Sequence, residues 1–116
     1  MSEAQAPLTP AMFNVLLALA DGDKHGYAIL KEVAAQTGGE VQLSTGTLYG
    51  IIKRLLQEGM IEELRRRPAS EQDDQRRRYY RLTTAGRDAA AAEARRMQKV
   101  VARARAKQLL SAPQPG

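Results

Sequence analysis

The stretch from Leu43 to Leu55 combines side chains that could bind phosphate with an apolar side that could anchor them. At about 100° per helical residue, four aliphatic residues share one sector, namely Leu48, Ile51, Ile52 and Leu55. The opposite sector holds Gly46, Gly50, Lys53, Arg54 and Gln57. Each exposed glycine costs a helix about 1 kcal/mol, so a bare backbone in this sector indicates close approach to another molecule. Lys53 and Arg54 favour phosphate contact, although a solvated pair is the alternative.

Hydroxyl side chains at the start of this stretch could read bases or fix the register on a nucleic acid. The candidates are Ser44, Thr45, Thr47 and Tyr49. Tyr49 lies at the border of the polar side, so contact with nucleic acid and partial burial are equally compatible with its position.

Catalysis and metal binding have little support in this sequence. Cysteine is absent and His25, the sole histidine, precedes Gly26 at a helix start, where a capping role is expected. The stretch from Gly46 to Gly50 lacks the Gly-Lys-Ser/Thr ending of a phosphate-binding loop. We expect neither an enzyme nor a cofactor.

Charge is distributed unevenly along the 116 residues, which suffice for one small domain and an extension. The chain has 18 Lys+Arg against 13 Asp+Glu; residues 1–60 carry a net −2, residues 61–82 carry +2, and residues 83–116 carry +5. This asymmetry favours a polyanionic partner, and nucleic acid over a membrane because large apolar anchors are missing beside the cations. With no cysteine, no charged leader and no bilayer-length apolar run, we expect a cytoplasmic protein.

Three helices are predicted before residue 60. The first starts at Thr9-Pro10 and ends at the Asp21-Gly22-Asp23 turn, and it is apolar on nearly every side, which suggests burial by a second subunit as well as by the core. The second is expected from about Gly26 to Thr37, burying Tyr27, Leu30, Val33 and Ala34. The third should be capped by Ser44, continue to Glu58 and stop at Gly59.

A two-stranded hairpin is predicted next, from Met60 to Arg67 and from Arg76 to Leu82, around a long polar loop. Tyr80 and Leu82 should face the helices, with Tyr79 and Arg81 on the other side. Arginines gather where the strands meet the loop, and a bound polyanion would relieve their mutual repulsion. We assign DNA contacts there to Arg66, Arg67, Arg76, Arg77 and Arg78.

A long helix is predicted from Thr83 or Thr84 to about Leu110. A heptad-like stripe of mostly small side chains runs along it, and we infer a homodimer seam. The interface residues assigned on this helix are Ala90, Ala94, Met97, Val100, Val101 and Ala104. The apolar first helix adds Phe13, Leu16 and Leu17. An inducer pocket would have to lie between the subunits, but nothing in that wall identifies a ligand.

The order and spacing of several short segments resemble the PadR family of bacterial transcriptional regulators. These segments are Leu8-Thr9, His25 to Ile29, Leu43 to Tyr49, Arg54-Leu55, Gly59 to Ile61, Tyr79 to Thr83 and Gly86-Arg87. The resemblance implies a dimeric repressor with its third helix in the major groove and its wing on the backbone or in the minor groove. The single helix after the hairpin resembles the shorter branch of that family.

We therefore expect a mainly α fold with a small β-hairpin: a winged helix-turn-helix domain at 8–82, a dimerisation helix at 83–110, and tails at 1–7 and 111–116. The leading hypothesis is a sequence-specific DNA-binding homodimer on an inverted-repeat operator, with half-sites about 34 to 36 Å apart. The alternative is a winged helix used for protein–protein interaction, which would show a salt-stable partner instead of salt-sensitive DNA binding.

Overall fold

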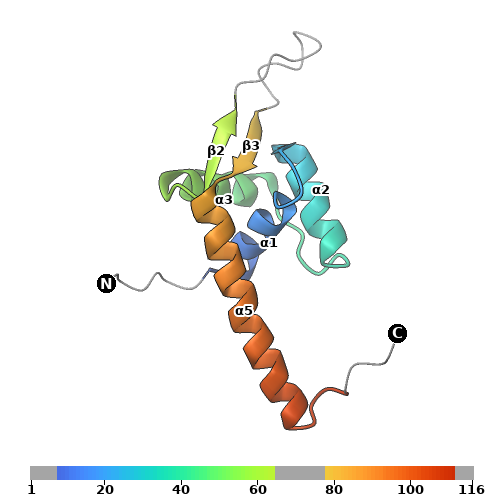
Figure 1. Cartoon of the computed structure of the whole chain (residues 1–116). Helices are drawn as coiled ribbons and strands as arrows, with labels where there is room; N and C mark the ends of the chain where they lie inside the picture. Colours follow the sequence, from blue (N-terminus) through green and yellow to red (C-terminus); the bar gives the residue numbers. More distant parts are fainter. Residues whose placement is uncertain (1–7, 65–77, 112–116) are drawn as a thin grey trace.

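A computed structural model describes residues 8–64 and 78–111 of the chain. The elements are α1 (Pro10–Ala18), β1 (Lys24–His25), α2 (Gly26–Gln36), α3 (Thr45–Gln57), β2 (Ile61–Leu64), β3 (Tyr79–Leu82) and α5 (Thr84–Ala106). Three helices pack beside a small sheet, and α5 leaves this body on the side away from the strand ends that lead to the hairpin loop (Figure 1). The mainly helical winged helix-turn-helix architecture is the one predicted.

Side chains cap the starts of the helices. The side chains of Thr9, Ser44 and Thr83 accept hydrogen bonds from the main-chain N–H groups three residues later, at 3.1, 3.1 and 3.0 Å. His25 caps α2 in the same way, with Nδ1 accepting from the Ala28 N–H at 3.2 Å. The predicted caps at Thr9, His25 and Ser44 are confirmed, and Gly59, with φ +74°, follows α3 as predicted.

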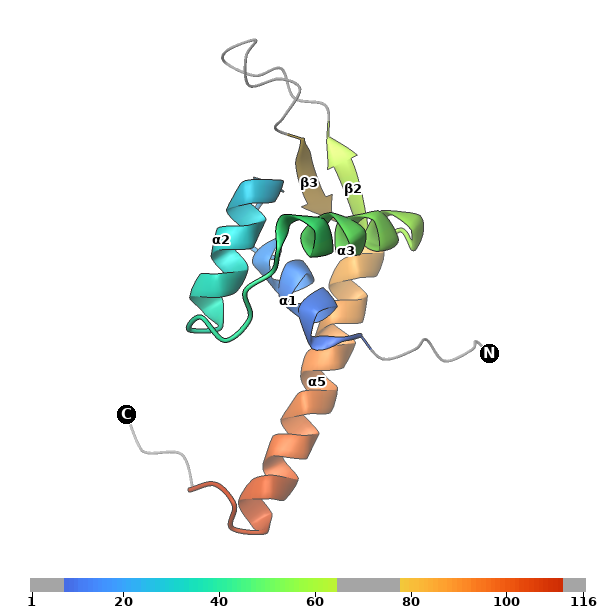
Figure 2. The same ribbon diagram turned by 180° about the vertical axis from the view of Figure 1, so that it is seen from behind.

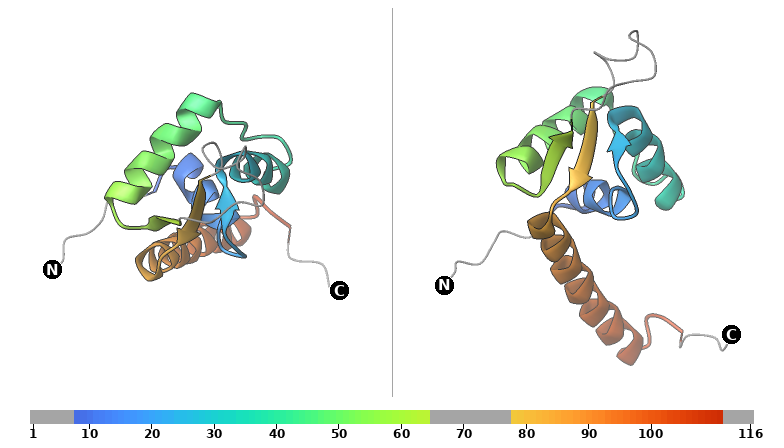
Figure 3. Two further views of the ribbon diagram at one scale, coloured as in Figure 1. Left: turned by 90° about the horizontal axis from the view of Figure 1, so that it is seen from above. Right: turned by 45° about the horizontal axis from the view of Figure 1, so that its top comes forward.

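The sheet has three antiparallel strands in the order β1-β3-β2. Tyr80 in the central strand lies opposite Lys24 on one side and Glu63 on the other. Strand β1, which was not expected from the sequence, is two residues long and leads directly into α2. Figure 3 shows β1 beside β3, so the sheet joins the start of α2 to the hairpin.

The core lies where α1, α2 and α3 meet the sheet. Its fully buried side chains include Val15, Leu16, Leu19, Ile29, Val33, Leu48, Ile52 and Leu55. Tyr80 and Leu82 of β3 are buried as predicted, at 3% and 9% exposure, whereas Arg81 is exposed. The helices and the sheet therefore share one core, which fixes the position of α3 in the fold.

Two details of the predicted helices are wrong. Tyr27 is 65% exposed, because the buried side of α2 is formed by Gly26, Ile29 and Val33. The last helix ends at Ala106 rather than near Leu110. Gln108 adopts φ +69°, and the N–H groups of Gln108 and Leu109 donate to the carbonyls of Arg105 and Ala104, which closes the helix.

The first turns of α5 are tightly joined to the body, and its second half is not. The Thr83 hydroxyl donates to the Gly59 carbonyl at 2.6 Å, and the Thr83 N–H donates to the Met60 carbonyl at 3.1 Å. Ala89 and Ala90 pack against the core, and Glu93 is buried. Beyond Glu93 most of the helix is exposed, since it extends past the body (Figure 1).

Candidate nucleic-acid interface

The outer side of α3 is exposed along its whole length. Leu48, Ile52 and Leu55 are buried, whereas Gly46, Gly50, Lys53, Arg54 and Gln57 are all exposed. Figure 2 shows α3 lying across the front of the body with β2 and β3 above it. The two-sided character predicted for this helix is therefore present in the fold.

The two glycines on this side have no internal reason to be glycine. A Cβ built at Gly46 or at Gly50 would meet no atom within 4 Å. Neither residue has the positive φ that would favour glycine. The fold would thus accept alanine at both positions, and the bare backbone leaves room for close approach of an external molecule.

Hydroxyl groups mark the start of α3. Ser44 Oγ accepts from the Thr47 N–H at 3.1 Å and donates to Thr47 Oγ1 at 3.0 Å. Both residues and Thr45 are exposed. Ser44 and Thr47 are therefore held in place by each other while one side of each remains accessible.

The two cations of α3 differ in their surroundings. Arg54 Nε donates to Glu58 Oε2 at 2.9 Å, one turn along the same helix. An exposed pair of this kind is worth only about 0.3 to 0.5 kcal/mol, so it can yield to a phosphate. Lys53 makes no ion pair within the residues that the structure describes. It is the more readily available phosphate ligand.

Tyr49 packs against the start of α2. A Cβ added to Gly26 would stand 2.3 Å from Tyr49 Oη and 2.9 Å from Cζ, so the ring covers a backbone position that must lack a side chain. Tyr49 remains 42% exposed. The ring thus packs α3 against α2 with part of its surface exposed, and contact between Tyr49 and nucleic acid stays a prediction.

Gly26→Ala is expected to push the Tyr49 ring outward and lower the free energy of unfolding by about 1 kcal/mol, the lower end of over-packing costs. Combining it with Tyr49→Phe should recover part of this loss, because the hydroxyl oxygen is the closest atom. Denaturant titration of Gly26→Ala, Tyr49→Phe and the double variant measures the coupling. Strictly additive effects would show that the ring does not constrain Gly26.

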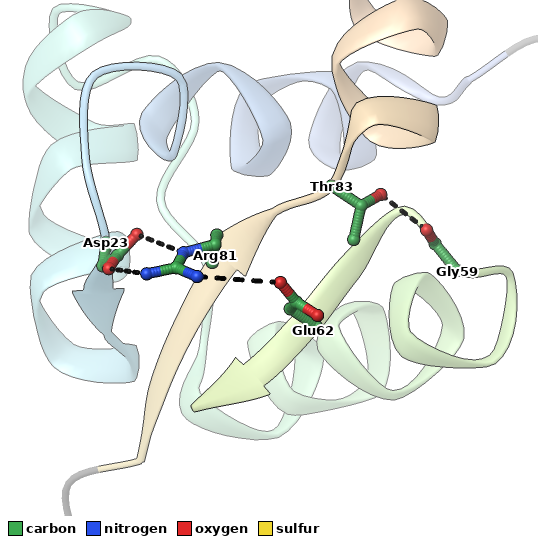
Figure 4. Close-up of polar contacts among 5 residues, drawn as sticks. All are labelled: Asp23, Gly59, Glu62, Arg81 and Thr83. Carbon is green, nitrogen blue, oxygen red and sulfur yellow. Dashed lines mark hydrogen bonds and ion pairs between the residues drawn. The ribbon is translucent and has the colours of Figure 1, made fainter. Parts of the chain in front are cut away.

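Polar contacts tie the wing strands to the body, as Figure 4 shows. Arg81 on β3 donates to both carboxylate oxygens of Asp23, at 3.4 and 3.3 Å, and lies 3.9 Å from Glu62 on β2. The Asp23 carboxylate, with a smaller contribution from Glu62, raises the pKa of Arg81. Arg81 therefore acts as a structural cation between the loop before β1 and the hairpin.

Of the predicted wing arginines, Arg78 lies within the described residues. Arg78 is exposed and its Nη1 lies 3.7 Å from Glu63 Oε2. The other assigned wing residues, Arg66, Arg67, Arg76 and Arg77, lie outside the described residues. Their role stays a prediction.

The exposed side of α2 adds two residues that sequence reasoning missed. Tyr27 is exposed and the Lys31 ammonium lies 5.4 Å from the centre of its ring. The first helix of a helix-turn-helix crosses the DNA backbone in known complexes, and this exposed pair is suited to such a contact. Tyrosine is amphipathic, so the sequence alone did not show whether Tyr27 faces the core or the solvent.

The nine residues assigned to the dimer seam differ in how far they are exposed. Five are exposed in the single chain: Leu17, Ala94, Met97, Val100 and Val101. Phe13, Ala90 and Ala104 are half-buried. Leu16 is 0% exposed within its own chain and leaves no surface for a partner, so its assignment to the interface is wrong.

The arrangement of α2, α3 and the hairpin defines a DNA-binding protein of the winged helix-turn-helix class. A family model for the PadR-like transcriptional regulators matches residues 15–92. The chain belongs to this family, and its single helix after the wing matches the short PadR architecture. It is thus a DNA-binding transcriptional regulator and not an enzyme.

Solved structures share this fold. A PadR family transcription regulator from Clostridium difficile R20291 has a TM-score of 0.70 at 23% identity, with coverage of 84% of this chain and 96% of that one. A transcriptional regulator from Clostridium thermocellum has a TM-score of 0.64 at 26% identity, with coverage of 79% and 86%. Bacillus subtilis PadR in complex with operator DNA has a TM-score of 0.61 at 17% identity, with coverage of 92% and 51%.

No match was found among curated proteins. Among the described residues, no helix is both long and apolar enough to span a bilayer.

Proposed function

We propose that this chain is a homodimeric repressor that reads an inverted-repeat operator with α3 in the major groove. The observation that carries the proposal is the exposed side of α3, where two glycines with open space above them lie beside Lys53 and Arg54. A helix placed in a major groove needs its backbone close to the DNA and cations at the flanking phosphates. Bacillus subtilis PadR, which shares this fold, has been solved in complex with operator DNA, and this supports DNA as the partner.

Sequence selectivity would come from the start of α3 and from DNA shape. Ser44, Thr45, Thr47 and the exposed edge of Tyr49 are the groups able to reach bases or fix the register. None of them is an arginine, asparagine or glutamine, the side chains that pair bidentately with single bases. DNA shape and deformability therefore have to supply part of the selectivity.

Phosphate contacts would come from both sides of α3. Lys53, Arg54 and Arg78 are the candidates within the described residues, with Tyr27 and Lys31 of α2 added by the structure. The arginines at positions 66, 67, 76 and 77 complete the proposed wing contact. Cytoplasmic location follows from the proposed role on DNA.

Lys53→Ala should weaken binding to operator and random DNA alike and lower the slope of log K against log salt by about one, because one phosphate contact is lost. Fluorescence anisotropy across a salt series measures both quantities. Arg105→Ala, in the last turn of α5, is the control and should leave the slope unchanged. If the Lys53 variant also keeps the parental slope, Lys53 is not in the interface.

Gly50→Ala should stabilise the protein by about 1 kcal/mol, because alanine favours the helix and nothing opposes its methyl group. Operator affinity should nevertheless fall about tenfold, since the methyl group stands where the backbone approaches DNA. Thermal denaturation and anisotropy separate the two effects. A variant that is both more stable and equally tight in binding would show that close approach at Gly50 is not required.

A further inference from the structure

The second half of α5 concentrates positive charge. Six cations follow Glu93, namely Arg95, Arg96, Lys99, Arg103, Arg105 and Lys107, and no acidic residue occurs between Ala94 and Ser111. Only Arg96 is paired with a carboxylate in the described part of the chain, through Glu93. Formation of a dimer along α5 would bring two such segments together and increase their repulsion.

Three of these cations form one continuous strip. Arg95, Lys99 and Arg103 follow one another at intervals of four residues, so each lies about 6 Å further along the helix. All three are exposed and have no ion pair within the described residues. We call this strip the basic face of α5.

The basic face stays free in the proposed dimer. At about 100° per residue, Lys99 lies roughly 160° around the helix from Met97 and from Val101, the centre of the seam. A partner packed on the seam would therefore leave Lys99 directed away from it. Arg95 and Arg103 lie on either side of Lys99 along the same strip.

The chemistry of the basic face selects a duplex as its partner. The residues around it are Ala92, Arg96, Ala102, Ala106 and Lys107, so it offers neither the aromatic anchors of protein interfaces nor the large apolar groups that enter membranes. Single-stranded nucleic acid would need aromatic side chains for base stacking, and α5 has none. Duplex DNA can be bound through phosphate contacts alone.

The position of the basic face on α5 rules out operator DNA bound at α3 as its ligand. The free half of α5 lies at the opposite end of the molecule from the outer ends of β2 and β3, as Figures 1 and 3 show. DNA that occupies α3 and the wing is thus remote from the basic face. A ligand of this face has to be another DNA segment.

We propose that the basic face of α5, formed by Arg95, Lys99 and Arg103, binds the backbone of a second DNA duplex without sequence preference. The proposed function supplies the first duplex, held at α3, so a regulator on its operator could hold a distant segment as well. Binding through a few phosphates is weak, with a dissociation constant of about 10⁻⁶ to 10⁻⁴ M, and disappears as salt is raised.

The first test isolates α5 from α3. A Lys53→Ala/Arg54→Ala protein is titrated with a scrambled 20-bp duplex at about 50 mM salt. Adding Lys99→Gln should reduce the remaining affinity several-fold, whereas adding Arg105→Gln removes the same charge roughly 120° around the helix from Lys99 and should reduce it much less. Equal reductions by the two substitutions, or no remaining binding to lose, would overturn the proposal whatever the outcome for the operator.

The second test measures bridging. The fragment upstream of the protein's own gene is tethered, loaded with protein and offered a labelled scrambled duplex. Arg95→Gln with Lys99→Gln should abolish capture of the labelled duplex. The amount of protein retained on the tethered fragment should not change. Failure to retain protein would count against the proposed operator function, whereas retention without capture would count against the second duplex site. Binding of phosphatidylserine vesicles in place of duplex would also contradict it.

Discussion

Gly86→Ala is expected to destabilise the protein by about 3 kcal/mol, the upper end of the usual cost of over-packing. A Cβ at this position would stand 1.9 Å from the Met60 carbonyl oxygen and 2.8 Å from the Met60 carbonyl carbon. Both are backbone atoms, so they cannot move aside as a side-chain end can. The gain of about 1 kcal/mol in helix propensity offsets only part of this cost.

The consequence extends beyond Gly86 because its neighbours hold the start of α5. The same Met60 carbonyl accepts the Thr83 N–H, and the Thr83 hydroxyl joins Gly59 to the Gly86 N–H. Displacing this turn would move the end of α3 and the start of β2 together. Denaturant titration measures the loss, with Gly46→Ala as the matched glycine in open space. If both variants were equally stable, the close approach at Gly86 would be wrong.

Met97→Glu combined with Val101→Glu is expected to convert the proposed dimer to a monomer. Both side chains are exposed on the single chain, at 37% and 39%, and one turn apart on α5. Two carboxylates in the centre of an apolar seam would be buried without a partner, which costs several kcal/mol. Loss of the second half-site should then weaken operator binding a hundredfold or more, about the size of a bivalent advantage.

Sedimentation velocity gives the oligomeric state and anisotropy gives the affinity of the same sample. Gln98→Glu with Ala102→Glu adds two carboxylates to another side of α5 and should remain dimeric. If the Met97 and Val101 variant stays dimeric and binds operator normally, the seam is wrongly placed. Because Leu16 is fully buried in its own chain, we expect the contact of α1 with the second subunit to be made by Leu17, which is 43% exposed.

The sequence was most informative where one local rule decides the structure. Ser44 and Thr9 cap their helices because the hydroxyl needs only an N–H three residues away. The two sides of α3 follow from helical periodicity alone, and so does strand alternation at Tyr80 and Leu82.

The features that sequence analysis missed depend on distant partners. β1 consists of Lys24 and His25 alone, and it exists because Tyr79 and Tyr80, more than 50 residues later, supply its hydrogen bonds. Gly26 and Gly86 were read only as parts of family motifs, since the groups that require glycine there belong to α3 and to Met60. Tyr27 could not be placed by periodicity, because a tyrosine tolerates either side of an amphipathic helix.

The role of α3 as a reading helix is tested most directly by binding of the purified protein to the DNA upstream of its own gene and to scrambled DNA of equal length, across a salt series. We expect a preference of about a thousandfold or more that survives moderate salt, with the slope lowered by Lys53→Ala. Equal and salt-fragile binding to both DNAs, unaffected by substitutions on α3, would contradict the assignment of α3 as the reading helix.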